Sequence, residues 1–270
     1  MTKLGNYTLI IVSTFILALQ PAEADNQIDT SERLLSSGSI KPQELRKRLH
    51  KQLKRQHKKQ LSYKSIWNYL KILDEDPNNS NNIILFYSRR SASKSDQYQG
   101  GKFPDKWNRE HLWPKSHGFK KKKQWAYTDL HHLRPADKTI NSSRNDLDFG
   151  EGGKKHKECD CRRNSMGRGR GTWEPPDEIK GDIARSMFYM DVRYEGTDAN
   201  TPDLQLVNAI TDSPSPYLGQ LCILFRWHKL DPPNELEKRR NDKIESIQGN
   251  RNPFIGQPSL ANLLYGKKCK

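Results

Sequence analysis

WNREHLWP, residues 107–114, is the most informative segment of this chain, and it is followed by DLHHLRP at residues 129–135 and NSSRND at residues 141–146. Four of the eight histidines lie between positions 111 and 132, among acids, amides and basic residues. A single histidine is most often a satisfied core or surface residue, so none of these identifies a site alone. The three segments are informative because together they place a base, oxygen ligands and cations within a short length of chain.

The side chains of these segments are those that hydrolysis of a phosphodiester requires. Such a reaction needs a base for water, a cation to neutralise charge on the phosphorane and the leaving oxygen, and positive side chains that hold the backbone. Glu110 and the amide oxygen of Asn141 are hard oxygen ligands, and Mg²⁺ takes only one or two protein ligands beside water and substrate. Histidine titrates near neutrality, which makes His111 the candidate base.

The motifs also resemble a known family. Glu110-His111 before a proline, the pattern DLHxLxP at residues 129–135, and Asn141 six residues after that proline resemble the endonuclease I family of ββα-metal (His-Me finger) nucleases. Within that family, the chain is similar to secreted Bsn-type extracellular nucleases. The segments that carry this similarity are WNREH at 107–111, KSHG at 115–118, HHLRPAD at 131–137, KGDIAR at 180–185 and RNPFI at 251–255. The likeness covers roughly residues 45–257.

This resemblance implies roles for three catalytic residues. His111 is the expected general base, and Glu110 and Asn141 are expected to hold one divalent cation, Mg²⁺ or else Ca²⁺ or Mn²⁺. The family fold presents the Glu-His pair on two antiparallel strands, and a helix over about residues 139–147 brings Asn141 across. Adjacent residues of a regular strand point to opposite faces, so we expect the Glu-His pair to lie where the strand ends or bends.

Further residues are candidates around this centre. Asp129, His131 and His132 are expected to orient the base or its neighbours rather than to bind metal. Three arginines, Arg109, Arg134 and Arg144, are candidate substrate contacts, and either of the last two would equally suit a structural ion pair.

Two segments depart from the family pattern. A run of four lysines at residues 120–123 either replaces the charge of a phosphate-binding arginine found in periplasmic members or is a solvated loop. The Lys-, Arg- and Gly-rich segment at about 150–171 has no recognised counterpart in the Bsn type, and we expect an exposed loop insertion there.

Composition and the N-terminus indicate an exported, polyanion-binding protein. The 270 residues contain 47 Lys and Arg against 32 Asp and Glu, a formal charge of +15, which favours anionic partners such as nucleic acid. Residues 1–24 are predicted to be a signal peptide, because Lys3 precedes an apolar run at residues 9–19 and the small-x-small sequence Ala22-Glu23-Ala24. We therefore expect a secreted or periplasmic protein without a membrane span, and a monomer.

The remaining periodicity predicts an α+β fold, mostly helical, in one domain at residues 45–270 around the ββα-metal motif, after a loose segment at 25–44. A stripe of Leu45, Leu49 and Leu53 predicts a basic amphipathic helix. Other helices are predicted from Ser62 to about Asp76-Pro77, from Asp177 to Val192, at 218–228 and, facing solvent, at 235–247. Residues 78–82 are predicted to turn, and 83–87 to form a buried strand.

Four cysteines in an exported chain indicate disulfide bonds. Cys159 and Cys161 are so close in sequence that we expect each to pair with a distant partner, Cys222 or Cys269. The alternative is a zinc site that includes His156, although neither cysteine pair has the spacing usual in zinc knuckles.

The sequence thus predicts a secreted, divalent-metal-dependent, sequence-nonspecific endonuclease that cuts DNA, RNA or both to 5′-phosphate and 3′-hydroxyl ends. Because water is the attacking group, a 2′-hydroxyl is not required. The alternative is a non-catalytic secreted protein that binds nucleic acid or glycan. Glu110, His111 and Asn141 discriminate between the two, because binding alone needs none of them.

Overall fold

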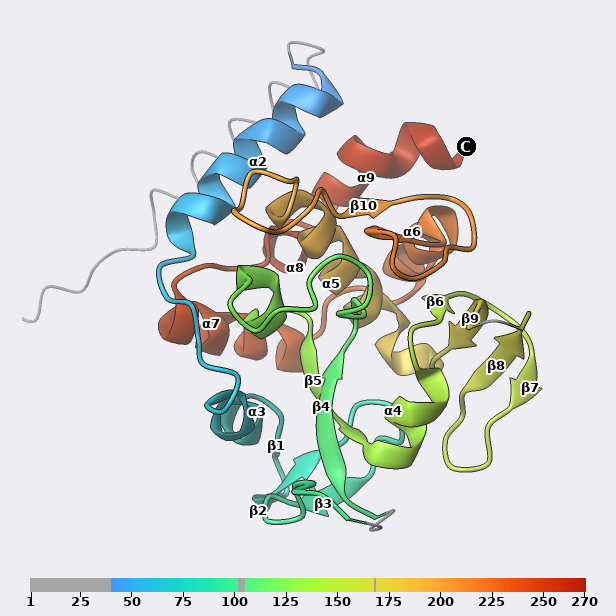
Figure 1. Cartoon of the computed structure of the whole chain (residues 1–270). Helices are drawn as coiled ribbons and strands as arrows, with labels where there is room; N and C mark the ends of the chain where they lie inside the picture. The colour runs from blue at the N-terminus through green and yellow to red at the C-terminus, as the bar shows by residue number, and fades with distance from the viewer. Residues whose placement is uncertain (1–39, 102–104, 168) are drawn as a thin grey trace, which may run out of the picture. The chain divides into compact units, whose positions relative to one another are not determined.

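The computed structural model of this protein describes residues 40–101, 105–167 and 169–270 (Figure 1). The chain divides into two compact units, residues 1–40 and 41–270, and the described helices and strands all belong to the second. The predicted signal peptide and most of the predicted loose segment lie outside the described residues, although helix α2 (Pro42–Gln56) already includes the last three positions of that segment. Within the described ranges, every helix is too short or too polar to cross a membrane.

Two antiparallel strands and a helix lie next to one another at the centre of the predicted motif. Strand β4 (Trp107–His111) pairs with β5 (Leu133–Asp137), so that Glu110 lies opposite Arg134. Helix α4 (Lys138–Arg144) follows β5 directly and packs beside both strands (Figure 1). His111 is the last residue of β4, as the alternation argument predicted. The helix is shorter than expected, because Asn145 adopts a left-handed backbone with φ of 55°.

Both ends of this ribbon are anchored in a hydrophobic core. Trp107 of β4 and Leu133 of β5 are fully buried against helix α3 (Ile66–Leu73), strand β2 (Asn79–Ile84) and helix α7 (Glu235–Gln248). Burial of each such side chain contributes about 1.5–3 kcal/mol to folding. Trp107 and Leu133 lie at opposite ends of the ribbon, with Leu133 directly across from His111. The core therefore fixes the ribbon at both ends, including the end that carries the Glu-His pair.

A layer of helices forms the rest of the unit. In helix α5 (Lys180–Arg193) every residue after Lys180 is buried, and the helix packs against α2, α6 (Leu221–Leu230) and α8 (Pro253–Gly256). Helix α9 (Ser259–Tyr265) contacts α2 and α8 and leads into the 3₁₀ helix η3 (Gly266–Cys269). The leucine stripe of α2 is buried, as predicted. An amphipathic helix turns its apolar side toward the core, and most of the basic residues on the other sides of α2 are exposed.

Three helical predictions need correction. The helix expected from Ser62 begins at Ile66, because Ser62 forms a turn in which its Oγ accepts a hydrogen bond from the Ser65 amide at 3.1 Å. Helix α7 is not simply solvent-facing, since Arg240 is buried and donates to Asp74 and to two backbone carbonyls. The helix expected from 218 begins at Leu221, because strand β11 (Tyr217–Leu218) instead pairs with β10 (Gln205–Leu206).

The strand predicted at 83–87 lies earlier in the chain. Strand β2 pairs with β1 (Glu75–Asp76) on one side and β3 (Ser91–Ser93) on the other, and it begins at Asn79, within the predicted turn. Its first residues are exposed, and backbone pairing alone does not need apolar side chains, so the sequence pattern did not reveal them. The following residues at 85–87 are buried outside the strand.

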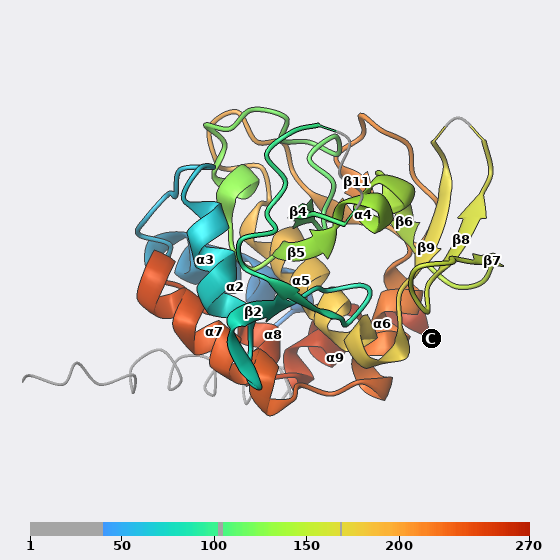
Figure 2. The same ribbon diagram turned by 90° about the horizontal axis from the view of Figure 1, so that it is seen from below.

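The predicted exposed loop at 150–171 contains short strands. Strands β7 (Lys154–Lys155), β8 (Arg162–Ser165), β9 (Gly171–Glu174) and β6 (Asp148–Phe149) form a sheet of order β6-β9-β8-β7, which lies near α4 at the edge of the unit (Figure 2). Two glycines with positive φ allow this packing, because a Cβ would lie 2.4 Å from the Arg163 carbonyl oxygen at Gly153 and 2.0 Å from the Asn164 carbonyl oxygen at Gly171. Polar residues form strands here because both faces of β7 are exposed.

The cysteines form two disulfides, but the predicted pairing is wrong. Cys159 is bonded to Cys161, and Cys222 to Cys269. The chain reverses between β7 and β8, which places the Cα atoms of the first pair 5.2 Å apart. Packing of η3 against α6 brings the second pair together. Among the described residues, no group of three or more His, Cys, Asp or Glu side chains is arranged to hold a metal, so the zinc alternative has no support.

Candidate active site

A pocket of about 470 Å³ lies where β4 ends beside α4. Arg109, Glu110 and His111 line it from the strand, and Asn141 lines it from the helix. The structure therefore brings together all three predicted catalytic residues and one predicted substrate contact. Strand pairing fixes the first group, and the short connection from β5 to α4 fixes Asn141 relative to it.

His111 is held in one tautomer. Its ring is buried, with 6 % of the residue exposed, and its Nε2 lies 3.0 Å from the carbonyl oxygen of Tyr127. A carbonyl can only accept, so Nε2 carries the proton, and in the neutral ring Nδ1 has a free lone pair. Burial, together with the neighbouring His132, holds the pKa of His111 well below its usual range. His111 is therefore neutral and able to accept a proton at Nδ1.

Glu110 has one engaged and one available oxygen. Its Oε1 accepts hydrogen bonds from the Tyr87 hydroxyl at 2.8 Å and from Arg144 Nη1 at 3.3 Å. No side chain among the described residues donates a hydrogen bond to Oε2, although the backbone amide of His111 also acts on the carboxylate and lowers its pKa. Burial raises the pKa of Glu110 above its usual range, and the charge of Arg144 and the Tyr87 hydrogen bond oppose that rise. The carboxylate is thus held in place by two donors on one side.

Asn141 is oriented by a neighbouring amide. Its Nδ2 donates to Oδ1 of Asn108 at 2.7 Å, which leaves its own Oδ1 without a partner in the described part of the chain. Glu110 and Asn141, each with one side-chain oxygen that accepts no side-chain hydrogen bond among the described residues, therefore line the same pocket. This donor set suits a hard cation such as Mg²⁺, which needs few protein ligands.

Arg109 lines the pocket with its guanidinium held over aromatic rings. The Cζ atom lies 3.5 Å from the ring centroid of Tyr63 and 4.1 Å from that of Trp67, and Nη1 donates to the Tyr63 carbonyl. Its Nε is buried without a hydrogen-bond partner among the described residues. Such stacking keeps the cation rigid at the pocket wall, where an anionic substrate would lie.

The other two predicted arginines have different surroundings. Arg144 is fully buried, and it donates to Glu110 and to the carbonyl oxygens of His111 at 3.1 Å and Leu112 at 2.6 Å. These contacts are those of a structural ion pair rather than of a phosphate clamp. Arg134 does not line the pocket but pairs with Asp74 at 3.1 Å, beside a separate cavity of about 100 Å³.

The predicted orienting residues divide into two groups. The His132 ring lies 5.4 Å from that of His111, and its Nε2 donates to the Ala126 carbonyl at 2.7 Å. Asp129 instead accepts hydrogen bonds from Tyr189 at 2.6 Å and Tyr194 at 2.7 Å. His131 bonds the Asn250 carbonyl at 3.0 Å. Asp129 and His131 thus tie the segment before β5 to the helical layer, and no contact of either with His111 is present among the described residues.

Basic residues also border the pocket on the side of the lysine run. Lys120 and Lys121 line a neighbouring cavity of about 410 Å³, which shares Ser116 with the main pocket. The Nζ of Lys122 lies 5.7 Å from the ring centroid of Tyr63. At least part of the run is therefore close to the site.

Sequence reasoning missed three residues that hold the site. Tyr87 bonds Glu110, Asn108 bonds Asn141, and the Tyr127 carbonyl bonds His111. Tyr87 offered one signal, since a phenol at the end of a buried apolar run needs a hydrogen-bond partner. Asn108 lies two residues before Glu110, on the same side of the strand, and so offered another.

One cavity is thus lined by a neutral histidine, by side chains with oxygen atoms that can bind a metal ion, and by positively charged side chains. This combination is typical of nucleases. Residues 42–259 match the family model described as Endonuclease I, and the chain belongs to this family. It is 47% identical to an extracellular ribonuclease of Bacillus amyloliquefaciens over 76% of this chain and 68% of that protein. It is also 45% identical to the extracellular ribonuclease of Bacillus subtilis (strain 168), over 76% of this chain and 69% of that protein.

A more distant relative carries a different substrate in its name. An extracellular deoxyribonuclease of Aeromonas hydrophila is 28% identical over 47% of this chain and 48% of that protein. The predicted location, secreted or periplasmic, agrees with the names of these relatives. The predicted recognition of the endonuclease I family is confirmed by the family match.

Proposed function

We propose that this chain is a secreted, divalent-metal-dependent endonuclease whose centre is a ββα-metal motif formed by β4, β5 and α4. One observation carries the proposal: His111, Glu110 and Asn141 line a single pocket, and His111 Nδ1, Glu110 Oε2 and Asn141 Oδ1 each have no side-chain partner among the described residues. A protein that only bound polyanions would gain nothing from a neutral buried histidine beside a buried carboxylate, and both cost free energy to desolvate.

His111 is the proposed general base. Its Nδ1 takes a proton from a water molecule as the water oxygen attacks phosphorus, and the Tyr127 carbonyl holds the opposite edge of the ring. Attack by water with departure of the 3′-oxygen leaves a 5′-phosphate and a 3′-hydroxyl. Arg109 is the proposed contact to the non-bridging oxygens of the substrate, because it lines the same pocket.

Glu110 and Asn141 are the proposed ligands of one divalent cation, with Mg²⁺ the first candidate and Ca²⁺ and Mn²⁺ the alternatives. When bound, the cation would supply positive charge against the developing negative charge of the phosphate and the leaving oxygen. Tyr87 and Arg144 keep Glu110 in position for this role, and Asn108 does the same for Asn141.

The proposed substrates are RNA and DNA without sequence preference. The names of the relatives include a ribonuclease and a deoxyribonuclease, and water as attacking group makes either polymer chemically suitable. No base-reading motif is recognised in the sequence, and contacts to the phosphate backbone carry no sequence information.

Degradation of plasmid DNA and of a long RNA tests the proposal, with Mg²⁺, Ca²⁺ or Mn²⁺ added and with EDTA. We expect cleavage with at least one cation and none with EDTA, and ligation of labelled adaptors should report 5′-phosphate ends. Tight binding without cleavage under every condition would support the alternative, a non-catalytic polyanion-binding protein.

A further inference from the structure

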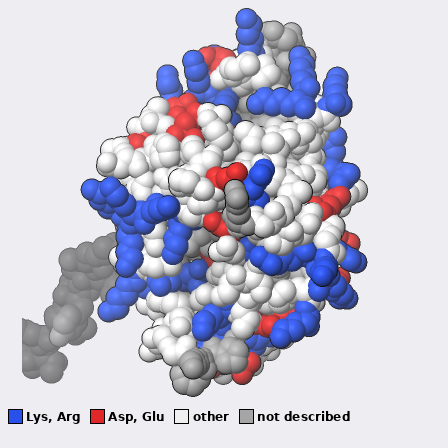
Figure 3. Space-filling view, turned by 45° about the vertical axis from the view of Figure 1, so that its right-hand side comes forward, with Lys and Arg blue, Asp and Glu red and all other residues white. Residues whose placement is uncertain are grey.

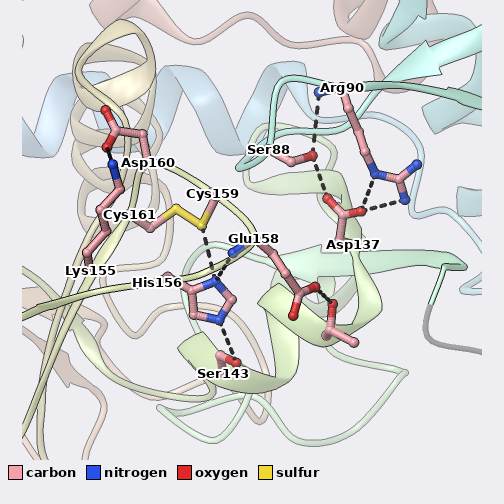
Figure 4. Close-up of a disulfide and its surroundings, with 11 residues drawn as sticks. Ser88, Arg90, Asp137, Ser143, Lys155, His156, Glu158, Cys159, Asp160 and Cys161 are labelled. Atoms are coloured by element: carbon pink, nitrogen blue, oxygen red, sulfur yellow. Dashed lines mark hydrogen bonds and ion pairs between the residues drawn. A yellow bond between two sulfur atoms is a disulfide. The ribbon is translucent and has the colours of Figure 1, made fainter.

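The hairpin of β7 and β8, with the turn between them, is a separate feature beside the pocket. We call residues 154–165 the Cys hairpin, because the Cys159–Cys161 disulfide closes its turn (Figure 4). The backbone amide of Glu158 donates to His156 Nδ1 at 3.2 Å, so the other ring nitrogen of a neutral His156 carries the proton. That nitrogen donates to Ser143 Oγ at 3.0 Å.

The Cys hairpin is attached to helix α4 at two points one turn apart. His156 bonds Ser143, and the carboxylate of Glu158 accepts a hydrogen bond from the Thr139 hydroxyl. The pocket lies against other positions of the same helix, including Asn141 and Ser142. The Cys hairpin and the pocket therefore both contact the short helix α4, and this helix is the element that connects them.

Strand register divides the hairpin into two faces. Lys154 lies opposite Arg163, which lies opposite Trp173 of β9. The next pair along, Lys155 and Arg162, lies on the other face, because side chains alternate along a strand. Trp173 is buried, and its ring lies 5.7 Å from that of Tyr87, the residue that bonds Glu110. The face that carries Lys154 and Arg163 is thus the face turned toward the proposed active site.

The two faces differ in whether their Lys and Arg side chains are paired with acidic residues. On the far face Lys155 pairs with Asp160 at 3.3 Å, and Arg162 lies 3.9 Å from Glu174. On the near face Lys154 and Arg163 are exposed, and neither forms an ion pair or a side-chain hydrogen bond with the described residues. Like charges directly opposite one another on two strands are destabilising. An anion that binds between them relieves this repulsion.

We propose that the near face of the Cys hairpin is a phosphate-binding arm, and that Lys154 and Arg163 bind the backbone of the nucleic acid strand outside the position of cleavage. This inference rests on the proposed nuclease function and extends the substrate path beyond the pocket. Figure 3, in which the right-hand side of Figure 1 comes forward, shows Lys and Arg spread over this surface with Asp and Glu among them. The arm contributes to the binding of long strands and is too far along the substrate to affect cleavage of a dinucleotide.

Two matched double variants test the arm. Lys154→Gln with Arg163→Gln removes the near pair, and Lys155→Gln with Arg162→Gln removes the same charge from the same strands on the far face. Each is made in a His111→Ala background, so that the substrate is bound and not cut. Fluorescence anisotropy with a labelled duplex, measured over a series of salt concentrations, gives the slope of log affinity against log salt.

We expect the near-face variant to reduce the magnitude of this slope by about 2, because each phosphate contact contributes about 1, and the far-face variant to leave it nearly unchanged. Equal losses in both variants, or no loss in either, would overturn the proposal. In proteins that retain His111, the near-face change should raise KM for a long duplex and leave cleavage of a dinucleotide unaltered. If the unmodified protein cuts no nucleic acid, the proposed function fails, while the anisotropy comparison still decides whether the arm binds phosphate.

Discussion

At the scale of single residues, the site depends on which atoms are already engaged. The Tyr127 carbonyl occupies His111 Nε2, Tyr87 and Arg144 occupy Glu110 Oε1, and Asn108 occupies the Asn141 amide nitrogen. Each contact leaves one atom available for chemistry and fixes its direction. Preorganisation of this kind matters because a reacting group held in place does not have to be reoriented during the reaction.

Replacement of His111 by alanine should remove general-base catalysis. We expect a rate loss on the order of 10² to 10⁴ with nearly unchanged affinity for nucleic acid. Plasmid nicking gives the rate and anisotropy gives the affinity. His228→Ala is the control, because His228 is also buried but contacts the Pro258 carbonyl, away from the pocket. Near-normal cleavage by the His111 variant would remove this residue from the mechanism.

Replacement of Tyr87 by phenylalanine should weaken the proposed cation site without touching any ligand. The buried hydroxyl donates to Glu110, and loss of a partner that orients a metal ligand typically costs about 10–100-fold in metal affinity or activity. A Mg²⁺ titration of the cleavage rate should shift to higher concentration. Tyr98→Phe is the matched control, since Tyr98 also lines the pocket but its hydroxyl bonds the Gly101 carbonyl. An identical titration for the Tyr87 variant and the parent protein would mean that Glu110 does not hold the ion.

At the scale of elements, two disulfides close segments of very different length. The Cys222–Cys269 bond joins α6 to η3 across 47 residues, whereas the Cys159–Cys161 bond spans two. A cross-link stabilises partly by restricting the unfolded chain, and this effect grows with the length of the closed segment. The long closure therefore serves stability, and the short one mainly shapes the turn of the Cys hairpin.

Cys222→Ala with Cys269→Ala should lower the free energy of unfolding by about 4 kcal/mol in the chain-entropy estimate, against about 1.6 kcal/mol for Cys159→Ala with Cys161→Ala. Urea unfolding of the oxidised variants measures both. A larger loss in the Cys159–Cys161 variant would show that the hairpin turn, rather than chain entropy, dominates. The catalytic residues contain no thiol, so cleavage at moderate temperature should persist in both.

At the scale of the whole molecule, three histidines outside the proposed catalytic set are buried in the neutral state. Burial lowers the pKa of His131, His132 and His228 to about 4 in each case. Their imidazoles are built into the packing through hydrogen bonds to backbone carbonyls. Acid therefore acts on the fold as a whole, because unfolding releases these rings to bind protons.

His228 allows a clean test of this acid sensitivity. Burial, with smaller effects from Arg185 and Lys229, lowers its pKa from 6.5 to about 4. Between these two values the unfolded chain binds more protons than the folded chain, so stability falls as the pH falls from 6.5 toward 4. Relative to His228→Gln, the parent protein should lose about 1–3 kcal/mol across this interval in urea unfolding. A pH-independent difference would contradict the prediction.

The sequence by itself determined the family and the helices with a clear apolar period. WNREHLWP placed Glu110 and His111 at a strand end. The stripe of α2 and the apolar run of α5 were visible because both signals repeat within a few residues. The mixed helix and strand content follows from the same short-range patterns. Where pairing involved polar residues, no such pattern existed, so the first residues of β2 and all of β8 were missed.

Only the tertiary structure decided how distant segments meet. Tyr87 reaches Glu110 across 23 residues, and Arg144 reaches it across 34, which makes Arg144 a buried support instead of an exposed phosphate contact. The cysteine pairing followed from a chain reversal in one case and from packing of η3 on α6 in the other. In the Cys hairpin, the cations of one face are paired with acidic residues and those of the other face are not. Strand register decides which residues lie on each face. Register and packing are set by contacts between parts of the chain that no local window of sequence contains.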